Sequence, residues 1–285
     1  MRSQPLVDVH NHLVPAVDDG AKSLEEAVRH LTALHADGVR QLAVTPHLFG
    51  WLTDEAGALA ERLDLLESAF ARLQDDCDGM PDVPELFFGQ EILCPTPQIA
   101  RRVFEEPRAG YRDTSYALVE FGFELQGNPT EVVAAVLAAE RRIIISHPER
   151  YRRKRLNVGI DELRGWKAAG ARLQVNGGSL LGDYGTAIHA LAWQLLTEGL
   201  ADLVSTDHHA DARVVSPAAT FEEIARRANR DVAELLPDVL RHRLILSYEG
   251  IAEGVTADSV SHALLERFPP PRIELTGARH DRVVA

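Results

Sequence analysis

The feature that most constrains the fold is a regular alternation of short apolar runs with longer amphipathic segments. Seven runs, rich in β-branched side chains, have the length and composition of buried strands. The segments between them repeat apolar residues at helical spacing. Strands that alternate with helices in this way form parallel sheets covered by helices, so the chain is predicted to be an α/β protein. The runs are residues 5–9, 41–45, 86–89, 116–119, 143–146, 172–175 and 202–205.

The clearest helix is predicted after Ser23, because Ser23-Leu24-Glu25-Glu26 is a capping box and Gly38 closes the segment. Further helices are predicted at about 55–73, 129–140, 161–169 and 186–198. With 285 residues we expect a closed barrel rather than an open sheet. We expect one domain over residues 1–267 and a loose, proline-rich tail over 268–285.

Composition excludes several classes of protein. No apolar stretch reaches the roughly 18 residues that a transmembrane helix needs, and no export signal is visible, so we expect a cytoplasmic protein without membrane insertion. A net charge of −13 argues against nucleic acid as a partner, because phosphate contacts need clustered Lys and Arg. With only Cys77 and Cys94, neither a disulfide framework nor a thiolate metal site is expected.

Side chains that bind metals follow most of the predicted strands. The first run leads into Asp8-Val9-His10-Asn11-His12, in which His10 and His12 share a face because they are two apart. Asp207 and His209 repeat this spacing after the last run. The residues that we single out as candidate ligands are His10, His12, Asp19, His47, Glu91, Glu120, His147, Asp207 and His209.

The carboxyl ends of parallel barrel strands meet on one face, so these imidazoles and carboxylates are expected to converge. Clustered carboxylates repel one another and are costly to bury without cations. A lone histidine at a strand end is usually a satisfied polar residue, and Asp18-Asp19-Gly20 alone is usually a turn, but their joint recurrence favours a metal centre. Mixed nitrogen and oxygen ligands suit manganese, iron or zinc better than calcium.

The remaining histidines are expected to take no part in this centre. His208 lies between Asp207 and His209 and should therefore point away from the cluster. The others fall on predicted helices or on the tail and are interpreted as ordinary surface residues. They are His30, His35, His189, His242, His262 and His280.

These motifs resemble the polymerase and histidinol phosphatase (PHP) superfamily of metallophosphoesterases. Within it the likeness is closest to the bacterial manganese-dependent protein-tyrosine phosphatases of capsule and exopolysaccharide operons, of the CpsB type. The most specific matches are Asp18-Asp19-Gly20 and His147-Pro148-Glu149-Arg150. The other matches, in family order, are Asp8 to His12, Thr45-Pro46-His47, Gly89-Gln90-Glu91, Leu118 to Phe121, Asn176 to Ser179, and Ser205 to His209.

The resemblance implies a distorted seven-stranded (β/α) barrel of TIM-like form that holds two or three metal ions, with manganese expected and iron or zinc as alternatives. It implies that His10, His12, Glu91 and Asp207 hold a first metal. It implies that Glu91, Glu120 and His147 hold a second, with Glu91 bridging, and that Asp19, His47 and His209 hold a third. Asp8 is expected to orient a ligand histidine.

The resemblance also implies a hydrolase that removes phosphate from protein phosphotyrosine by attack of a metal-bridging hydroxide. Its partner would be a phosphotyrosyl protein such as a bacterial tyrosine kinase of exopolysaccharide synthesis. Arg150 and Arg213 are expected to bind the phosphoryl oxygens, although a surface ion pair with Glu149 is the ordinary alternative for Arg150. The basic run 150–155 is either a solvated loop or a guide for acidic phosphopeptides.

Three other functions are considered beside this one. A cysteine-based phosphatase requires an arginine six positions after the cysteine, but Cys77 has Val83 there and Cys94 has Ala100, so we reject it. A small-molecule phosphatase, such as a histidinol-phosphate phosphatase, would share the fold and the metals. A docking module that binds metal without catalysis would not require the complete set of ligands.

Overall fold

The computed structural model describes residues 5–228. The chain divides into two compact units, residues 1–224 and 225–285. The expected domain boundary after residue 267, the tail over 268–285, and His242, His262 and His280 all lie outside the described residues. None of the helices within 5–228 combines the length and the apolar character that a membrane span requires.

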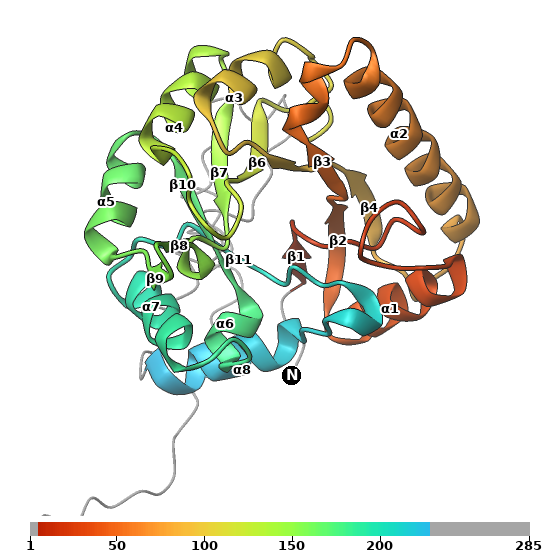
Figure 1. Cartoon of the computed structure of the whole chain (residues 1–285). Helices are drawn as coiled ribbons and strands as arrows, with labels where there is room; N and C mark the ends of the chain where they lie inside the picture. Colours follow the sequence, from red (N-terminus) through yellow and green to blue (C-terminus); the bar gives the residue numbers. More distant parts are fainter. Residues whose placement is uncertain (1–4, 229–285) are drawn as a thin grey trace, which may run out of the picture. The chain divides into compact units, whose positions relative to one another are not determined.

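The first unit is built on parallel strands that follow one another in sequence order, as Figure 1 shows, with helices outside them. One sheet has the order β1-β2-β4, and a second has the order β11-β10-β7-β6-β5-β3. The expectation of an α/β fold with parallel sheets is confirmed. The strands are β1 (Leu6–Asp8), β2 (Val39–Val44), β3 (His47–Phe49), β4 (Glu85–Phe88), β5 (Glu91–Leu93), β6 (Tyr116–Glu120), β7 (Arg142–Ser146), β10 (Arg172–Asn176) and β11 (Leu203–Ser205).

On one side, the two sheets are joined by two strands that each run from one sheet into the other, β2 into β3 and β4 into β5. β2 pairs with β4, and after Pro46 the same chain continues as β3, which pairs with β5. Since proline has no N–H to donate to a ladder, it marks the point where the pairing changes. On the other side, the ring closes through backbone hydrogen bonds from Asp207 N to His10 O and from His12 N to His208 O. Counting β2 with β3 and β4 with β5 as one interrupted strand each, the nine segments of the two sheets within residues 5–228 form seven strands around one axis, in agreement with the seven predicted runs.

The central strands β6, β7 and β10 are buried on both faces, which explains why their sequences are continuously apolar rather than alternating. In β7, for example, Ile143, Ile144, Ile145 and Ser146 are all buried. β4 differs, because exposed and buried residues alternate along it. The interior strands pack against amphipathic helices that surround the ring. These helices are α1 (Leu24–Ala36), α2 (Ala58–Cys77), α3 (Pro97–Val103), α4 (Pro129–Ala138), α5 (Ile160–Ala168), α6 (Gly177–Leu181), α7 (Thr186–Thr197) and α8 (Pro217–Ala228).

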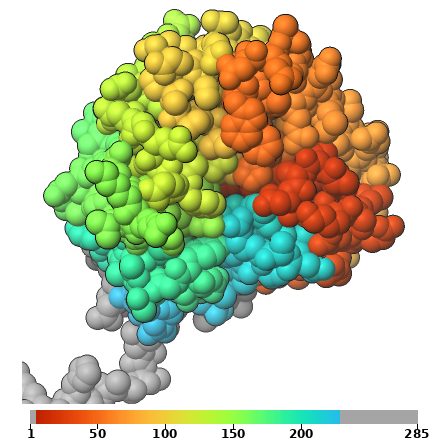
Figure 2. All heavy atoms as spheres, in the orientation of Figure 1, coloured from red at the N-terminus to blue at the C-terminus, as the bar shows by residue number. Residues whose placement is uncertain are grey.

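The predicted helices are present, and the cap of α1 is the one expected: Ser23 Oγ accepts a hydrogen bond from Glu26 N. The short helices α3 and α6 were not predicted. Nor was the hairpin of β8 (Arg152–Arg153) and β9 (Leu156–Asn157), which follows β7. Figure 2 shows the face toward which Figure 1 looks, where segments from early, middle and late parts of the described chain meet around the centre.

Candidate metal centre

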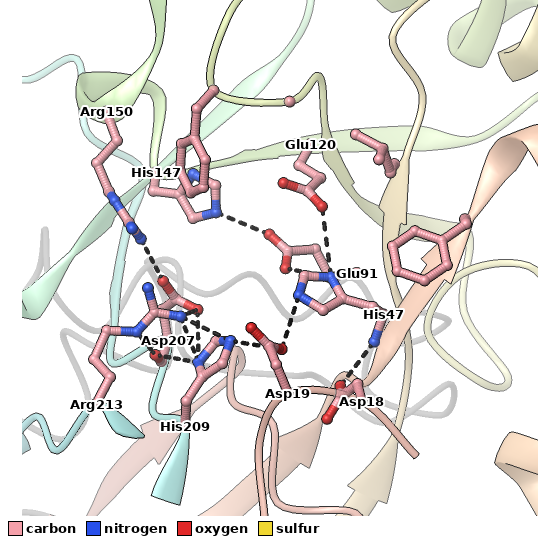
Figure 3. A pocket seen from close by; sticks show the side chains of 14 residues that line it. Asp18, Asp19, His47, Glu91, Glu120, His147, Arg150, Asp207, His209 and Arg213 are labelled. Carbon is pink, nitrogen blue, oxygen red and sulfur yellow. Dashed lines mark hydrogen bonds and ion pairs between the residues drawn. The ribbon is translucent and has the colours of Figure 1, made fainter. Parts of the chain in front are cut away.

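The candidate ligands meet around a cavity of about 460 Å³ at the carboxyl ends of the strands. Figure 3 shows Glu91 in the middle of the group, with His147, Glu120, His47 and Asp207 around it. The side chains that line the cavity are Asp18, Asp19, His47, Phe49, Glu91, Leu93, Glu120, Gly122, Phe123, His147, Arg150, Asp207, His209 and Arg213. His10 and His12 lie beneath them, completely buried.

The deepest group consists of His10, His12, Glu91 and Asp207. Glu91 Oε2 lies 3.3 Å from Nε2 of both histidines. Asp207 Oδ1 lies 3.4 Å from Nε2 of His10 and 3.6 Å from Nε2 of His12. Four potential ligand atoms thus face one point, and their four residues are those assigned to the first metal by the family resemblance.

A second group lies on the other side of Glu91. Nδ1 of His47 is 3.3 Å from Glu91 Oε2 and 3.5 Å from Glu120 Oε1. Nε2 of His147 is 3.0 Å from the other oxygen of Glu91, Oε1. The side chain that completes a set of possible ligands with Glu91 and Glu120 is thus His47. His147, the histidine expected there, contacts Glu91 alone of the two carboxylates.

The third group is closest to solvent and combines Asp19, His47 and His209 with His12. Asp19 Oδ1 lies 3.4 Å from Nε2 of both His47 and His209. The Asp19 side chain is 69% exposed, whereas the deeper carboxylates are buried. An incoming substrate would therefore meet this side of the centre first.

The electrostatics of the cluster fit divalent cations. Burial and the neighbouring carboxylate of Glu91 raise the pKa of Glu120 to about 8, which the nearby histidines only partly offset. Burial opposes protonation of His10 and His47, but carboxylates outweigh it and raise their pKa values to about 9 and about 10. In addition, the buried Nδ1 of His47 has no hydrogen-bond partner although two carboxylates face it. A cation between these atoms would satisfy all of them.

Two residues that were not among the candidate ligands, Asp18 and Gln174, accept hydrogen bonds that orient the histidines of the cluster. Asp18 Oδ2 lies 2.9 Å from Nδ1 of His12 and also accepts a bond from His47 N. Burial opposes ionisation of Asp18, but the hydrogen bond from His12 lowers its pKa to about 2. Gln174 Oε1 lies 2.8 Å from Nδ1 of His10. Such partners fix the tautomer of a metal ligand and turn its other nitrogen inward.

The turn that carries Asp18 and Asp19 packs tightly on the strand end beneath it. A side chain at Gly20 would lie 1.8 Å from His12 O, and the next residue, Ala21, donates its N–H to that same oxygen. Only glycine leaves room for this approach. The Asp18-Asp19-Gly20 piece is therefore a turn, and it is also the means by which two carboxylates reach the histidines.

The expected role of Asp8 is wrong. The Asp8 carboxylate forms no hydrogen bond or ion pair with a histidine of the described residues but accepts hydrogen bonds from Ser205 Oγ, Thr206 N and Thr206 Oγ1. It therefore ties β1 to the end of β11, next to the point where the ring closes. Asn176 supports the same loop, because its Nδ2 donates to Asp207 Oδ2 over 2.8 Å.

His208 points away from the cluster as predicted, since its Nε2 lies 2.8 Å from Nδ1 of His30. The prediction of a surface position for His30 is wrong. His30 is only 5% exposed and connects His208 to Asp211, whose Oδ1 lies 2.9 Å from its Nε2. The helix that carries His30, α1, packs against the segment 210–212, which a sequence pattern could not reveal. His35 and His189 are partly exposed.

Both candidate phosphate-binding arginines line the cavity. Arg150 Nη1 lies 2.7 Å from Asp207 Oδ2, and its guanidinium stacks between the rings of Phe123 and Tyr184, at 4.6 and 4.4 Å. The alternative of an ion pair with Glu149 is not observed, because Glu149 is fully buried and accepts a hydrogen bond from Asn176 N.

The second arginine, Arg213, reaches the same carboxylate from the opposite side. Its Nη2 lies 3.1 Å from Asp207 Oδ1 and also contacts the His209 ring. Figure 3 shows both guanidinium groups on one side of the centre, directed at Asp207. Two planar cations at the mouth of a cluster of metal ligands can hold an anion against it.

Comparisons with known proteins agree with this geometry. A family model described as capsular polysaccharide synthesis, CpsB/CapC, matches residues 6–237. Tyrosine-protein phosphatase YwqE of Bacillus subtilis (strain 168) is 29% identical over 207 residues, which are 72% of this chain and 77% of that protein. Tyrosine-protein phosphatase CpsB of Streptococcus agalactiae is 23% identical over 252 residues, covering 84% of this chain and 100% of that protein.

A solved structure shares the fold. It belongs to a study of YwqE from Bacillus subtilis and CpsB from Streptococcus pneumoniae, which describes them as unique metal-dependent tyrosine phosphatases. The match has a TM-score of 0.65 at 24% sequence identity and covers 85% of this chain and 96% of that chain. The arrangement of strands and helices described above is therefore the PHP-type barrel of that structure.

Proposed function

The chain belongs to the CpsB/CapC family of capsular polysaccharide synthesis proteins, and from this premise we propose that it is a metal-dependent protein-tyrosine phosphatase. The observation that carries the proposal is the convergence of five imidazoles and four carboxylates on one cavity that two arginines also line. Relatives across most of the chain are named tyrosine-protein phosphatases, which supports the substrate class.

We assign the metal ligands as three sets, of which the first two share Glu91. His10, His12, Glu91 and Asp207 would hold the first ion, and Glu91, Glu120 and His147 the second. Asp19, His47 and His209 would hold the third. Glu91 would bridge, because its two oxygens face different histidines. We propose manganese as the resident ion, since this donor set mixes imidazole with carboxylate, and iron and zinc remain alternatives for elemental analysis.

In the proposed reaction, bound divalent ions would lower the pKa of water to generate the nucleophile and neutralise charge on the phosphoryl oxygens. Arg150 and Arg213 would hold those oxygens, and the stacking of Arg150 between two rings fixes its planar fork before substrate arrives. Phe49 and Phe123 line the cavity and offer apolar contact to the aryl ring. We assign no general acid, because a phenolate with a pKa near 10 leaves without much assistance.

We propose that the substrate is a phosphotyrosyl protein in the cytoplasm, such as a bacterial tyrosine kinase of exopolysaccharide synthesis. The test is phosphate release from a phosphotyrosyl peptide and from histidinol phosphate, each with and without manganese. We expect manganese-dependent release with a clear preference for the peptide. A preference for histidinol phosphate would show that the substrate is a small molecule and not a phosphotyrosyl protein. Absence of phosphate release from either compound would favour a docking module.

The first prediction concerns phosphate recognition. Arg150→Lys keeps the charge but loses the planar fork, and we expect it to lower kcat/KM by about 10- to 100-fold, roughly 1.4–2.8 kcal/mol. The loss should be equal for a phosphotyrosyl peptide and a small aryl phosphate, because the phosphoryl group is the only part of either substrate that Arg150 would contact. Steady-state kinetics on both substrates measure this. Arg101→Lys, at an exposed position of α3, is the matched control, and an equal response of the two variants would exclude Arg150 from the site.

A further inference from the structure

A basic hairpin lies at the rim of the candidate metal centre. It consists of β8 and β9, residues 152–157, which pair antiparallel with Arg152 opposite Asn157 and Arg153 opposite Leu156. Arg152 N donates to Phe123 O over 2.7 Å, and Leu125 N donates to Arg152 O over 2.8 Å. Since Phe123 lines the cavity, the hairpin is joined directly to the wall of the site.

The basic hairpin carries four cationic side chains, and three of them form no ion pair within the described residues. Arg153 is engaged, because its guanidinium bonds Glu162 at 2.7 Å and Gly127 O at 3.2 Å. Within the described part of the chain, Arg152, Lys154 and Arg155 make no side-chain ion pair, and all three are exposed. Among residues 5–228, Glu124 is the acidic side chain that hydrogen-bonds the hairpin turn, and it accepts Arg155 N at 3.4 Å. The turn is therefore positive in a chain whose net charge is −13.

The turn of the basic hairpin is made from residues that its backbone disfavours. Lys154 and Arg155 form the two-residue loop and have φ values of +51° and +65°. Positive φ at both central positions characterises the type I′ turn, which favours Asn-Gly because side chains with a Cβ are strained there. Lysine and arginine are thus present in spite of local backbone preference. Strained positions of this kind cluster at functional sites.

We propose that the basic hairpin binds acidic residues that flank the phosphotyrosine of a protein substrate, an inference that rests on the proposed function. Each two-residue strand spans about 7 Å, so the turn lies a short distance from the cavity wall at Phe123. An extended peptide with its phosphotyrosine in the cavity would bring side chains two to four residues away over the turn. Arg152, Lys154 and Arg155 would meet aspartate, glutamate or a further phosphate there.

The test replaces the turn by the residues that its backbone prefers. In the double variant Lys154→Asn/Arg155→Gly we expect a melting temperature equal to or above that of the unmodified protein, because strain is relieved. We expect kcat/KM for a small aryl phosphate to remain within about twofold, since neither residue lines the cavity. For a phosphotyrosyl peptide flanked by Asp and Glu, kcat/KM should fall about three- to tenfold at low salt, mainly through KM.

Two comparisons make the test specific. A phosphotyrosyl peptide whose acidic residues are changed to Ser and Asn should be unaffected, and roughly 0.5 M salt should remove the difference between peptides. Arg72→Asn/Arg101→Asn, which removes two exposed charges from α2 and α3, is the control for net charge. Equal losses on both peptides, or none on the acidic peptide, would overturn the inference. If the unmodified protein released no phosphate from either peptide, the proposed function itself would fail instead.

Discussion

Glu91→Ala is expected to lower kcat by at least about 1000-fold while the barrel remains folded. One oxygen of Glu91 lies 3.3 Å from ring nitrogens of His10, His12 and His47, and the other lies 3.0 Å from His147. Removing this side chain would therefore disconnect two of the proposed metal positions at once. His147→Ala would remove one ligand of the second position, and we expect a similar loss.

The fold should survive because both side chains lie among polar groups at the strand ends rather than in the apolar core. Loss of Glu91 also removes the charge that contributes to raising the pKa of Glu120 to about 8, so it relieves a repulsion. Circular dichroism and a melting curve check folding, and bound metal per chain checks the site. Glu61→Ala, at an exposed position of α2, is the matched control. Near-normal turnover in either site variant would contradict the ligand assignment.

The central strands β6, β7 and β10 were predictable because burial on both faces makes their sequences continuously apolar, a signal that does not depend on tertiary context. Pro46, which follows β2, could be seen in the sequence, but its effect on strand pairing could not. It transfers the chain to a second sheet and sets His47 in register with Glu91. The turn of β8 and β9 carries Lys154-Arg155 where a hairpin signal would be Asn-Gly, so no local pattern indicated it.

The site residues were predictable from position, since parallel strands bring their carboxyl ends together whatever the details of packing. The residues that orient them were not, because their partners are defined only once the ring closes. Gln174 could have been suspected as a buried amide in the apolar strand β10. Asp8 illustrates the opposite case, since its spacing from His10 suggested a ligand partner but the end of β11 lies nearer.

Chelation is expected to abolish activity, lowering kcat/KM at least about 1000-fold, and manganese to restore it, because the proposed nucleophile is generated by bound divalent ions. Metal that binds only the folded chain stabilises it by about 2.7 kcal/mol at 100 times its Kd, which corresponds to a rise in melting temperature of roughly 5–10 °C. A melting curve with and without manganese therefore tests binding independently of turnover. The same treatment of Glu91→Ala should give a smaller rise.

Alkylation with iodoacetamide separates this chemistry from a cysteine nucleophile. Cys94 is fully buried and Cys77 nearly so, and burial raises the pKa of both thiols, so little thiolate is present to react. Neither cysteine lines the cavity. The metal-loaded, folded protein should therefore keep its activity after alkylation, with mass spectrometry reporting the extent of modification. Inactivation in proportion to modification of one cysteine, with bound metal retained, would show that the reaction passes through a thiol. The proposal that bound metal ions generate the nucleophile would then be wrong.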